Sequence, residues 1–426
     1  MPKKEFEKTK LANGVEVVTN AMSGRASVAI GIWVRSGGRY ENLQNKGIAH
    51  FLEHLLFKGS KKYSCRQLKE AIEGRGGSLN GFTAEEMTCY LTKIPSRYLD
   101  LGLDVLSDMV LNPLLEDEEI AKEKTVIIEE IKMYKDLPQS HVHELLDELL
   151  WPGQPLGVSL AGSVETVSAI NQEALSKFQK EFYTCSNIVV SVAGALKHKD
   201  VVKKAKEAFG TLKKSKRNSF VPATVDQKEP QLKILNKDTE QTHLAMGYHA
   251  IAREHPLRHA ATLLNIVLGG NMSSRLFDEM REKRGLAYEI GAGIRRFYDT
   301  GVFIVHAGID NSKVEEALEI ILTELSKIKK ELVSEGEFKR AKDFYLGQLA
   351  LALEDTSDNM LLLGEALTAG EKIHTYRNLC SQVNRVRRPD ICEAAKLFFK
   401  EEKLNLALIG PLAEKETRIK SCLKLS

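Results

Sequence analysis

The sequence of 426 residues contains no apolar run that approaches the roughly 20 residues needed for a bilayer-spanning helix, so no transmembrane segment is predicted. Its six cysteines are far apart and form no C-x-x-C pair. A chain of this size needs no disulfide framework, so we expect reduced thiols. Residues 1–7 lack the apolar segment of a signal peptide and the Arg/Ser-rich, acid-poor character of a transit peptide. These absences predict a cytoplasmic protein.

The chain also has little net charge. It contains 61 Lys and Arg against 58 Asp and Glu, which gives +3 with neutral histidines. This balance gives no reason to expect nucleic acid or an anionic membrane as a partner, and we expect neither. With 43% hydrophobic and 28% charged residues, the composition is that of a globular protein and excludes a disordered chain. The length predicts two or three domains.

The pattern of apolar residues predicts the same order of elements twice. The first half has an Asn-Gly hairpin signal, and its predicted strands and helices include residues 27–34, 47–57, 64–73, 78–92, 97–112, 116–135, 140–150, 187–193 and 198–210. A stretch rich in Lys and containing Pro then interrupts the apolar periodicity, which is typical of a linker. Beyond it, strands and helices are predicted again near 232–236, 242–249, 256–268 and 273–283.

Several identities support a duplication. At an offset of 209 residues the matching pairs are His50 with His259, Glu70 with Glu279, Glu73 with Glu282, Arg75 with Arg284 and Gly76 with Gly285. Chance matches in Glu- and Arg-rich helices are the alternative, but the order of elements favours duplication. We therefore predict an N-terminal domain over 1–212, a linker over 213–231 and a C-terminal domain over 232–426, each a mixed α/β sandwich.

A five-residue motif in the first predicted helix points to metal chemistry. His50 and His54 are one helical turn apart on one face, so both imidazoles can reach one ion. Glu53 can reach the same pocket and take a proton from a water that the metal activates. This is the inverted zincin order, H-x-x-E-H. The flanking residues are apolar nearly all round, and polar groups buried there need partners. A stray surface pair is the alternative.

A catalytic zinc needs a third protein ligand and one open position. The predicted helix over 116–135 offers Glu123, Glu129 and Glu130. Glu123 and Glu130 share a face two turns apart, whereas Glu129 points about 100° away from Glu130. The spacing does not choose among them, and a solvated acidic face is the alternative.

The motif is followed by Glu130, which lies 76 residues after His54, and by Glu123, which lies seven residues before Glu130. This pattern resembles the pitrilysin/mitochondrial-processing-peptidase family of zinc metallopeptidases, the inverzincins of peptidase family M16. The similarity extends along almost the whole chain and includes the segments 31–41, 76–85, 268–277 and 281–288. It implies an α+β fold of two similar α/β sandwich domains, LuxS/metallohydrolase-like, joined by a linker. The chain is the short type, with one pair of domains.

The resemblance also implies roles for individual residues. His50, His54 and Glu130 would bind one Zn²⁺ per chain, Glu53 would be the general base, and Glu123 would support the site from behind. Substrate contacts are implied for Arg281 and Tyr288 and for an edge strand that would pair with the peptide, formed by Asn80, Gly81 and Phe82. The alternatives are that Arg281 is a solvated helix charge, that Tyr288 is a half-buried core residue and that residues 80–82 form an ordinary edge strand.

The implied activity is a zinc-dependent endopeptidase that cleaves peptides or unfolded, presequence-like segments inside a dimeric chamber. Because the zinc motif and the Arg/Tyr pair occur in one chain, a homodimer is expected, with a heterodimer with a related chain as the alternative. Two other functions compete: a non-catalytic assembly or peptide-binding subunit, and a hydrolase of small amides. The intact motif argues against the first, and the edge strand argues against the second.

Other histidines are predicted to be structural or to lie on the surface. They are the His141/His143 group and the pair His255/His259, whose spacing has no accompanying glutamate. At the 209-residue offset, Glu53 aligns with Thr262 and His54 with Leu263. The second half is therefore expected to lack a metal site and to serve as scaffold and substrate wall.

Overall fold

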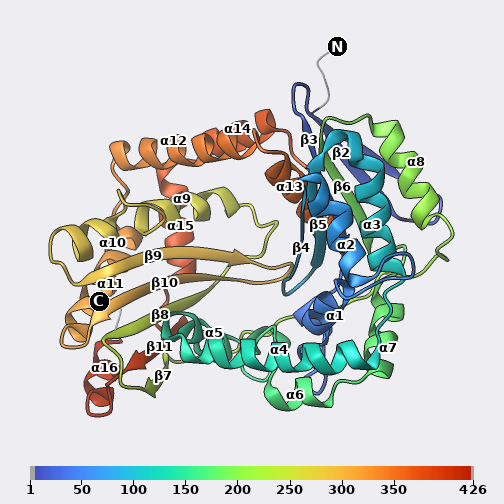
Figure 1. Cartoon of the computed structure of the whole chain (residues 1–426). Coiled ribbons are helices and arrows are strands. Elements are labelled where there is room, and N and C mark those ends of the chain that lie inside the picture. The colour runs from blue at the N-terminus through green and yellow to red at the C-terminus, as the bar shows by residue number, and fades with distance from the viewer. Residues whose placement is uncertain (1–4, 424–426) are drawn as a thin grey trace. The chain divides into compact units, whose positions relative to one another are not determined.

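The computed structural model describes residues 5–423. Residues 1–4, part of the segment 1–7 discussed above as a possible signal or transit peptide, lie outside the described residues. The chain forms two compact units. Unit 1 comprises the described residues up to Ile131 together with Ser159–Val221 and Leu349–Thr375. Unit 2 comprises Lys132–Val158, Pro222–Gln348 and the described residues from Tyr376 onward. Each unit contains one β-sheet with helices packed on it (Figure 1).

Unit 1 is built on a six-stranded sheet with the strand order β1-β2-β6-β3-β5-β4. The strands are β1 (Glu7–Lys10), β2 (Glu16–Ala21), β3 (Ser27–Val34), β4 (Ser78–Thr83), β5 (Thr88–Pro95) and β6 (Ile188–Gly194). Its helices are α1 (Ile48–Leu56), α2 (Cys65–Ile72), α3 (Leu99–Leu111), most of α4 (Asp117–Asp136), α6 (Val164–Ala169), α7 (Gln172–Phe182), α8 (His198–Phe209), the end of α12 and α13 (Thr356–Ala369).

Unit 2 is built on a five-stranded sheet with the strand order β7-β11-β8-β10-β9. The strands are β7 (Gln231–Asn236), β8 (Gln241–Ala250), β9 (Ala287–Arg296), β10 (Gly301–Asp310) and β11 (Leu404–Gly410). Its helices are α5 (Pro138–Leu150), α9 (Arg258–Leu268), α10 (Arg275–Phe277), α11 (Val314–Lys330), most of α12 (Glu335–Ala352), α14 (Tyr376–Arg385), α15 (Arg388–Phe398) and α16 (Glu416–Cys422).

The two sheets repeat one topology. In unit 1, β6 pairs in parallel with β2 and antiparallel with β3, and β5 lies between β3 and β4. In unit 2, β11 pairs in parallel with β7 and antiparallel with β8, and β10 lies between β8 and β9. Gly76 and Gly285, aligned by the 209-residue offset, both have a positive φ, at 76° and 59°. The predicted fold of two similar α/β sandwiches is confirmed.

The central strands of each sheet are buried on both faces, because each unit takes one helix from the other half of the chain. In unit 1, α13 packs on β3 and β6 (Figure 1), and its Met360 and Leu363 belong to the same buried apolar cluster as Trp33. Arg35 donates hydrogen bonds of 2.7 Å to the carbonyls of Leu367 and Thr368 at the end of α13, where orphan carbonyls need donors. In unit 2, α5 packs on β8 and β11.

Helix α5 falls in the predicted N-terminal domain, over 1–212, but packs in unit 2. Helix α13 falls in the predicted C-terminal domain, over 232–426, but packs in unit 1. The predicted domains differ from the units here because each helix packs on a sheet that is far away in sequence. Between Phe209 and Gln231 the described chain forms neither a helix nor a strand, and the linker over 213–231 stays a prediction. The helix predicted over 273–283 is shorter, since α10 passes into a π-helix at Asp278–Glu282. Within residues 5–423, no helix combines the length and apolar character needed to cross a membrane.

Candidate metal centre

A buried ion pair holds the helix that carries the predicted motif. The Glu41 carboxylate accepts hydrogen bonds from the backbone N–H groups of Gly47 and Ala49, at 3.1 and 2.8 Å, at the start of α1. Lys46 lies 3.3 Å from the same carboxylate and donates to the Gly38 carbonyl. Because the first N–H groups of a helix lack internal acceptors and favour negative charge, this pair fixes the N-terminus of α1. The sequence analysis missed both Glu41 and Lys46, although an acidic residue shortly before a helix was an available signal.

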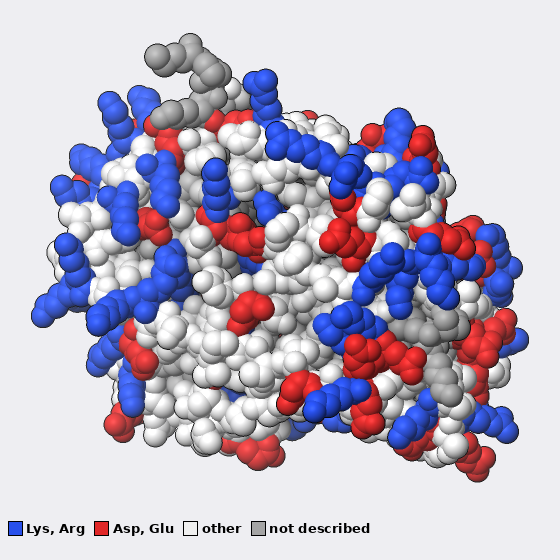
Figure 2. Space-filling model, turned by 180° about the vertical axis from the view of Figure 1, so that it is seen from behind, with Lys and Arg blue, Asp and Glu red and all other residues white. Residues whose placement is uncertain are grey.

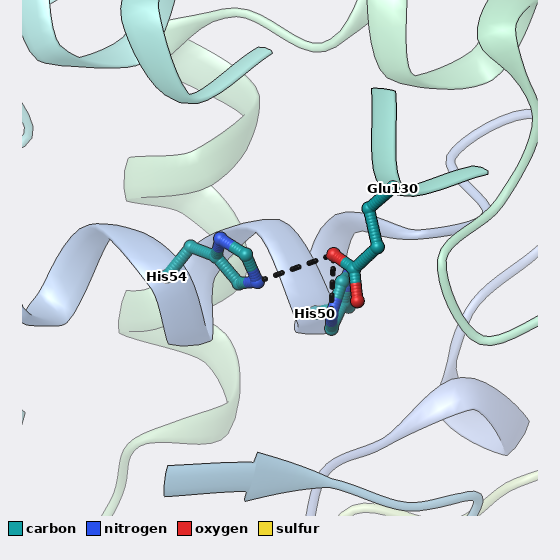
Figure 3. Close-up of side chains that lie close together, drawn as sticks. All are labelled: His50, His54 and Glu130. Carbon is teal, nitrogen blue, oxygen red and sulfur yellow. Dashed lines mark ion pairs between the residues drawn. The ribbon is translucent and has the colours of Figure 1, made fainter. Parts of the chain in front are cut away.

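Three predicted ligands converge. The Oε2 atom of Glu130 lies 3.8 Å from Nε2 of His50 and 3.7 Å from Nε2 of His54. The histidines project from α1 and the glutamate from α4, and all three point into one space (Figure 3). Their ligand atoms lie within 4.8 Å of one another, and no other cluster within residues 5–423 brings three metal-ligating groups together in this way. Of the glutamates left open by the spacing, Glu130 is the one that faces both imidazoles.

This arrangement fits a zinc ion. A tetrahedral ion with bonds of about 2.1 Å holds its ligand atoms about 3.4 Å apart, close to the separations observed here. Two imidazoles and one carboxylate form a set used by catalytic zinc sites. Burial lowers the pKa of His50 to about 4, with a further contribution from His54, so its imidazole is neutral at pH 7 and able to bind a metal. Its Nδ1 atom is buried without a hydrogen-bond partner among the described residues.

Glu123 lies behind the three ligands. Its Oε2 atom is 3.1 Å from Nδ1 of His54, and its Oε1 atom is 2.5 Å from Nζ of Lys58. A carboxylate on the second nitrogen of an imidazole fixes the ring orientation and leaves Nε2 free to bind a metal. Glu123 thus contacts the ring of His54, and its supporting role stays a prediction. The sequence analysis missed Lys58, whose position four residues after His54 was the available signal.

Glu53 is buried beside the edge strand β4. A Cβ atom built on Gly81 would lie 2.9 Å from Oε1 of Glu53 and 3.0 Å from the ring of Phe57. The glycine therefore leaves room for the carboxylate. Burial raises the pKa of Glu53 to about 7, partly opposed by His54 and increased by the nearby Glu130 carboxylate.

The predicted substrate strand is the last strand of its sheet. β4 pairs with β5 along one edge, and the sheet order places no other strand of the described chain on its second edge. The N–H of Gly81 donates a 2.8 Å hydrogen bond to Oδ1 of Asn80. Phe82 packs edge-on against Trp33, with ring centroids 5.7 Å apart. Asn80, Gly81 and Phe82 thus lie on one exposed edge strand, and Gly81 brings it against Glu53.

Arg281 and Tyr288 lie together in unit 2. The Arg281 guanidinium is 4.9 Å from the centroid of the Tyr288 ring and 5.0 Å from that of Phe277. Arg281 belongs to the π-helix Asp278–Glu282, a rare geometry that occurs frequently at functional sites. Tyr288 is the second residue of the edge strand β9 and is 76% exposed. The two residues form a cation–π pair, and the sequence analysis missed Phe277 as their partner.

The remaining histidine groups have other partners. Nε2 of His259 lies 2.9 Å from Oε1 of Gln382, and Nδ1 of His255 accepts the N–H of Leu257. His143 packs edge-on against His306, with ring centroids 5.8 Å apart. His259 is thus held by a structural hydrogen bond at the position that aligns with the ligand His50.

Comparisons with known proteins find similarity along most of the chain. The family profile "Insulinase (Peptidase family M16)" matches residues 16–164, and the profile "Peptidase M16 inactive domain" matches residues 169–345. The "uncharacterized zinc protease YmxG" of Bacillus subtilis is 33% identical over 94% of this chain and 97% of that protein. The chain belongs to peptidase family M16. A second relative, the "uncharacterized zinc protease SCO5738" of Streptomyces coelicolor, is 34% identical over 96% of this chain and 90% of that protein.

Solved structures share the M16 fold. A protease from Helicobacter pylori superposes with a TM-score of 0.89 at 24% identity, covering 95% of this chain and 99% of that chain. A peptidase M16 inactive domain from Pseudomonas fluorescens has the same TM-score at 18% identity, covering 95% and 98%. The recognition of an M16 member from its motifs is thereby confirmed.

Proposed function

We propose that this M16 member is a zinc-dependent endopeptidase that cleaves peptides or unfolded, presequence-like segments. The observation that carries the proposal is the convergence of His50, His54 and Glu130 beside the buried carboxylate of Glu53. The names of its relatives support zinc, and we propose one ion per chain.

The chain's own groups have separate tasks in this proposal. A bound zinc supplies Lewis acidity, which activates a water and polarises the scissile carbonyl. Glu53 takes the proton of the attacking water at its carboxylate and returns it to the leaving amine. Glu123 keeps Nδ1 of His54 occupied, so that Nε2 of the ring faces the metal. The pair of Glu41 and Lys46 keeps α1 in place throughout.

The substrate is proposed to bind as an extra strand. Its backbone would pair with the open edge of β4, which passes directly over Glu53 at Gly81. Asn80 would then release the Gly81 N–H to a substrate carbonyl. Arg281 and Tyr288, held against each other in unit 2, are proposed to contact the peptide near the scissile bond. We propose the cytoplasm as the compartment, and the six unpaired cysteines support it.

The test is cleavage of internally quenched peptides by the purified chain and by Glu53→Gln, with zinc measured in both. We expect the variant to keep its zinc and to lose activity by about 10²–10⁴-fold, the usual range for removal of a general acid–base. Equal cleavage by both proteins would overturn the role of Glu53.

A non-catalytic assembly or peptide-binding subunit is the competing function. It draws support from the inactive-domain profile that matches residues 169–345. A wild-type chain that holds zinc, binds peptides and cleaves none of them would favour that alternative.

The proposed homodimer has its own test. If Arg281 and Tyr288 of one subunit serve the metal centre of the other, mixing Glu53→Gln with Arg281→Ala creates some intact composite sites. Random exchange in a two-fold dimer then restores about a quarter of the wild-type activity. No recovery after demonstrated subunit exchange would place both groups in the same chain's site, and a monomeric active chain would exclude the chamber.

A further inference from the structure

The near-neutral charge of the whole chain conceals a strongly basic segment. Residues 197–217 contain nine Lys or Arg and two acidic residues, a local charge of +7, whereas the whole chain has +3. The other 405 residues therefore carry a charge of −4. A separation of this size orients a molecule in the field of a charged surface.

The structure places most of this charge on one surface of unit 1. Lys199, Lys203 and Lys206 recur at i, i+4 and i+7 along α8, and all three are exposed. The opposite side of the helix buries Val201 and Phe209 in the core of unit 1. We define the basic face as these three lysines together with Lys197, Lys213, Lys214 and Lys216, which are also exposed.

The part of the basic face that follows α8 is fastened to unit 1. Sγ of Cys185 donates to the Lys213 carbonyl at 3.0 Å, and Oγ of Ser186 donates to the Lys216 carbonyl at 3.0 Å. Nδ2 of Asn13 donates to the carbonyl of Phe209 at the end of α8. Backbone groups make these contacts, so the lysine side chains are left to solvent.

The charges of the basic face are not neutralised internally. Within residues 5–423 none of its seven ammonium groups makes an ion pair, whereas the neighbouring Lys204 pairs with Asp100 and Glu207. Figure 2 shows Lys and Arg side chains gathered along the left edge of the view, the side on which α8 lies when the molecule is turned.

From this face we propose that the protein docks peripherally on an anionic lipid membrane. The seven charges of this face belong to lysines, which act as point charges, and the exposed Arg217 of the same segment lies 3.9 Å from the carboxylate of Glu16. The face has no exposed aromatic side chain on which a base could stack. Exposed lysines on the outer side of a helix suit the planar negative potential of a membrane surface, which acts within a Debye length. The sequence analysis expected no membrane partner because it used the net charge of the whole chain, in which the positive charge of this face is offset by acidic residues elsewhere.

The test is co-sedimentation of the full chain with vesicles. One set contains equal parts of phosphatidylglycerol and phosphatidylcholine, and the other contains phosphatidylcholine alone. At about 50 mM salt we expect at least about tenfold stronger partitioning to the anionic vesicles, and loss of that preference near 500 mM salt.

Matched variants identify the surface. Lys199, Lys203, Lys206 and Lys214 are changed together to Gln, and the control changes the exposed lysines Lys69, Lys180, Lys396 and Lys400 to Gln. Both variants lose four charges. We expect binding to fall by about tenfold or more in the first and to change by less than about twofold in the second. Peptide cleavage and the unfolding midpoint serve as folding controls.

Three outcomes would overturn the proposal: equal partitioning to both vesicle types, equal loss in both variants, or binding of duplex DNA with the same lysine dependence and no vesicle binding. The last would assign the basic face to nucleic acid. None of these results depends on peptidase activity, so the proposal stands or falls separately from the proposed function.

Discussion

Helices α1 and α9 occupy equivalent places in the two units but carry different chemistry. In α1, His54 and Glu53 face the convergent site, whereas the aligned residues of α9 are Leu263 and Thr262. Leu263 is fully buried in the core of unit 2, and Thr262 donates a hydrogen bond to the backbone of its own helix. The same scaffold therefore supports a polar pocket in one unit and ordinary apolar packing in the other.

The edge strands show the same difference. Gly81 of β4 aligns with Ile290 of β9 at the 209-residue offset. In unit 1 the glycine leaves room for the Glu53 carboxylate, whereas in unit 2 the isoleucine joins the apolar core. A duplicated fold can thus lose a site by filling its space with side chains while the sheet topology stays unchanged.

The largest effect that separates the units is expected at α4, whose Glu130 is the proposed third ligand of the metal centre. Glu130→Gln should lower zinc affinity by more than about 100-fold, since even residues behind the ligands contribute about 10–100-fold. The exposed neighbour Glu129 is the control, and Glu129→Gln should bind zinc as the wild type does. Chelator competition measures both affinities. Equal losses in the two variants would contradict the ligand assignment.

A bulkier side chain on β4 should impair chemistry without removing the metal. Gly81→Val would displace the Glu53 carboxylate, and a misplacement near 1 Å can cost about 100-fold in rate, so we expect kcat to fall about 10–100-fold with zinc retained. Gly293→Val on β9 is the matched control, because a Cβ at Gly293 meets no atom within 4 Å. If the control lost as much activity as the test variant, crowding at Glu53 would not be the cause.

Loss of the buried cap on α1 should reduce stability. Glu41→Gln removes one partner of a buried ion pair, which costs about 3–5 kcal/mol for pairs of this kind. Chemical denaturation measures the change. Adding Lys46→Met should recover part of it, because the double variant no longer buries an ammonium group. Wild-type stability in the single variant would show that the pair does not hold α1.

The smallest effect is expected in unit 2, where lowering the pH should reduce the free energy of unfolding through His143. Burial lowers the pKa of His143 to about 4, with further contributions from His306 and Arg295. The folded state favours neutral His143, so its contribution to stability is complete above the ordinary pKa near 6.5 and is lost as the pH falls towards 4.

Between pH 7 and 5, the wild type should therefore lose about 1–2 kcal/mol more unfolding free energy than His143→Gln. Urea denaturation at the two pH values measures this difference. Parallel losses in both proteins would remove His143 as the titrating group.

Local patterns were sufficient for the elements that build the site. The strand over 27–34 and the helix around His50 form where the pattern of apolar residues placed them. The spacing could not select Glu130, since Glu123 and Glu130 share a face of α4. Only the three-dimensional packing separates them, because Glu123 lies behind His54 and Glu130 faces both imidazoles.

Long-range packing was beyond the sequence analysis. Which sheet α5 or α13 covers depends on the match between two apolar surfaces, and a local pattern shows only that such a surface exists. The acidic residue before α1 was visible in the sequence, but its burial with Lys46 was not, because charged residues near a helix start are usually solvated. The basic face was missed for a different reason: the charge was summed over the whole chain, and Lys213–Arg217 was taken only as linker.

Zinc content per chain tests the central claim, that unit 1 holds the metal centre and unit 2 has only its scaffold. The measurement compares the wild type with His50→Ala and with His259→Ala, the aligned histidine of unit 2. We expect one zinc per chain in the wild type and in His259→Ala, and none in His50→Ala. Zinc retained by His50→Ala, or lost from a folded His259→Ala, would contradict the account.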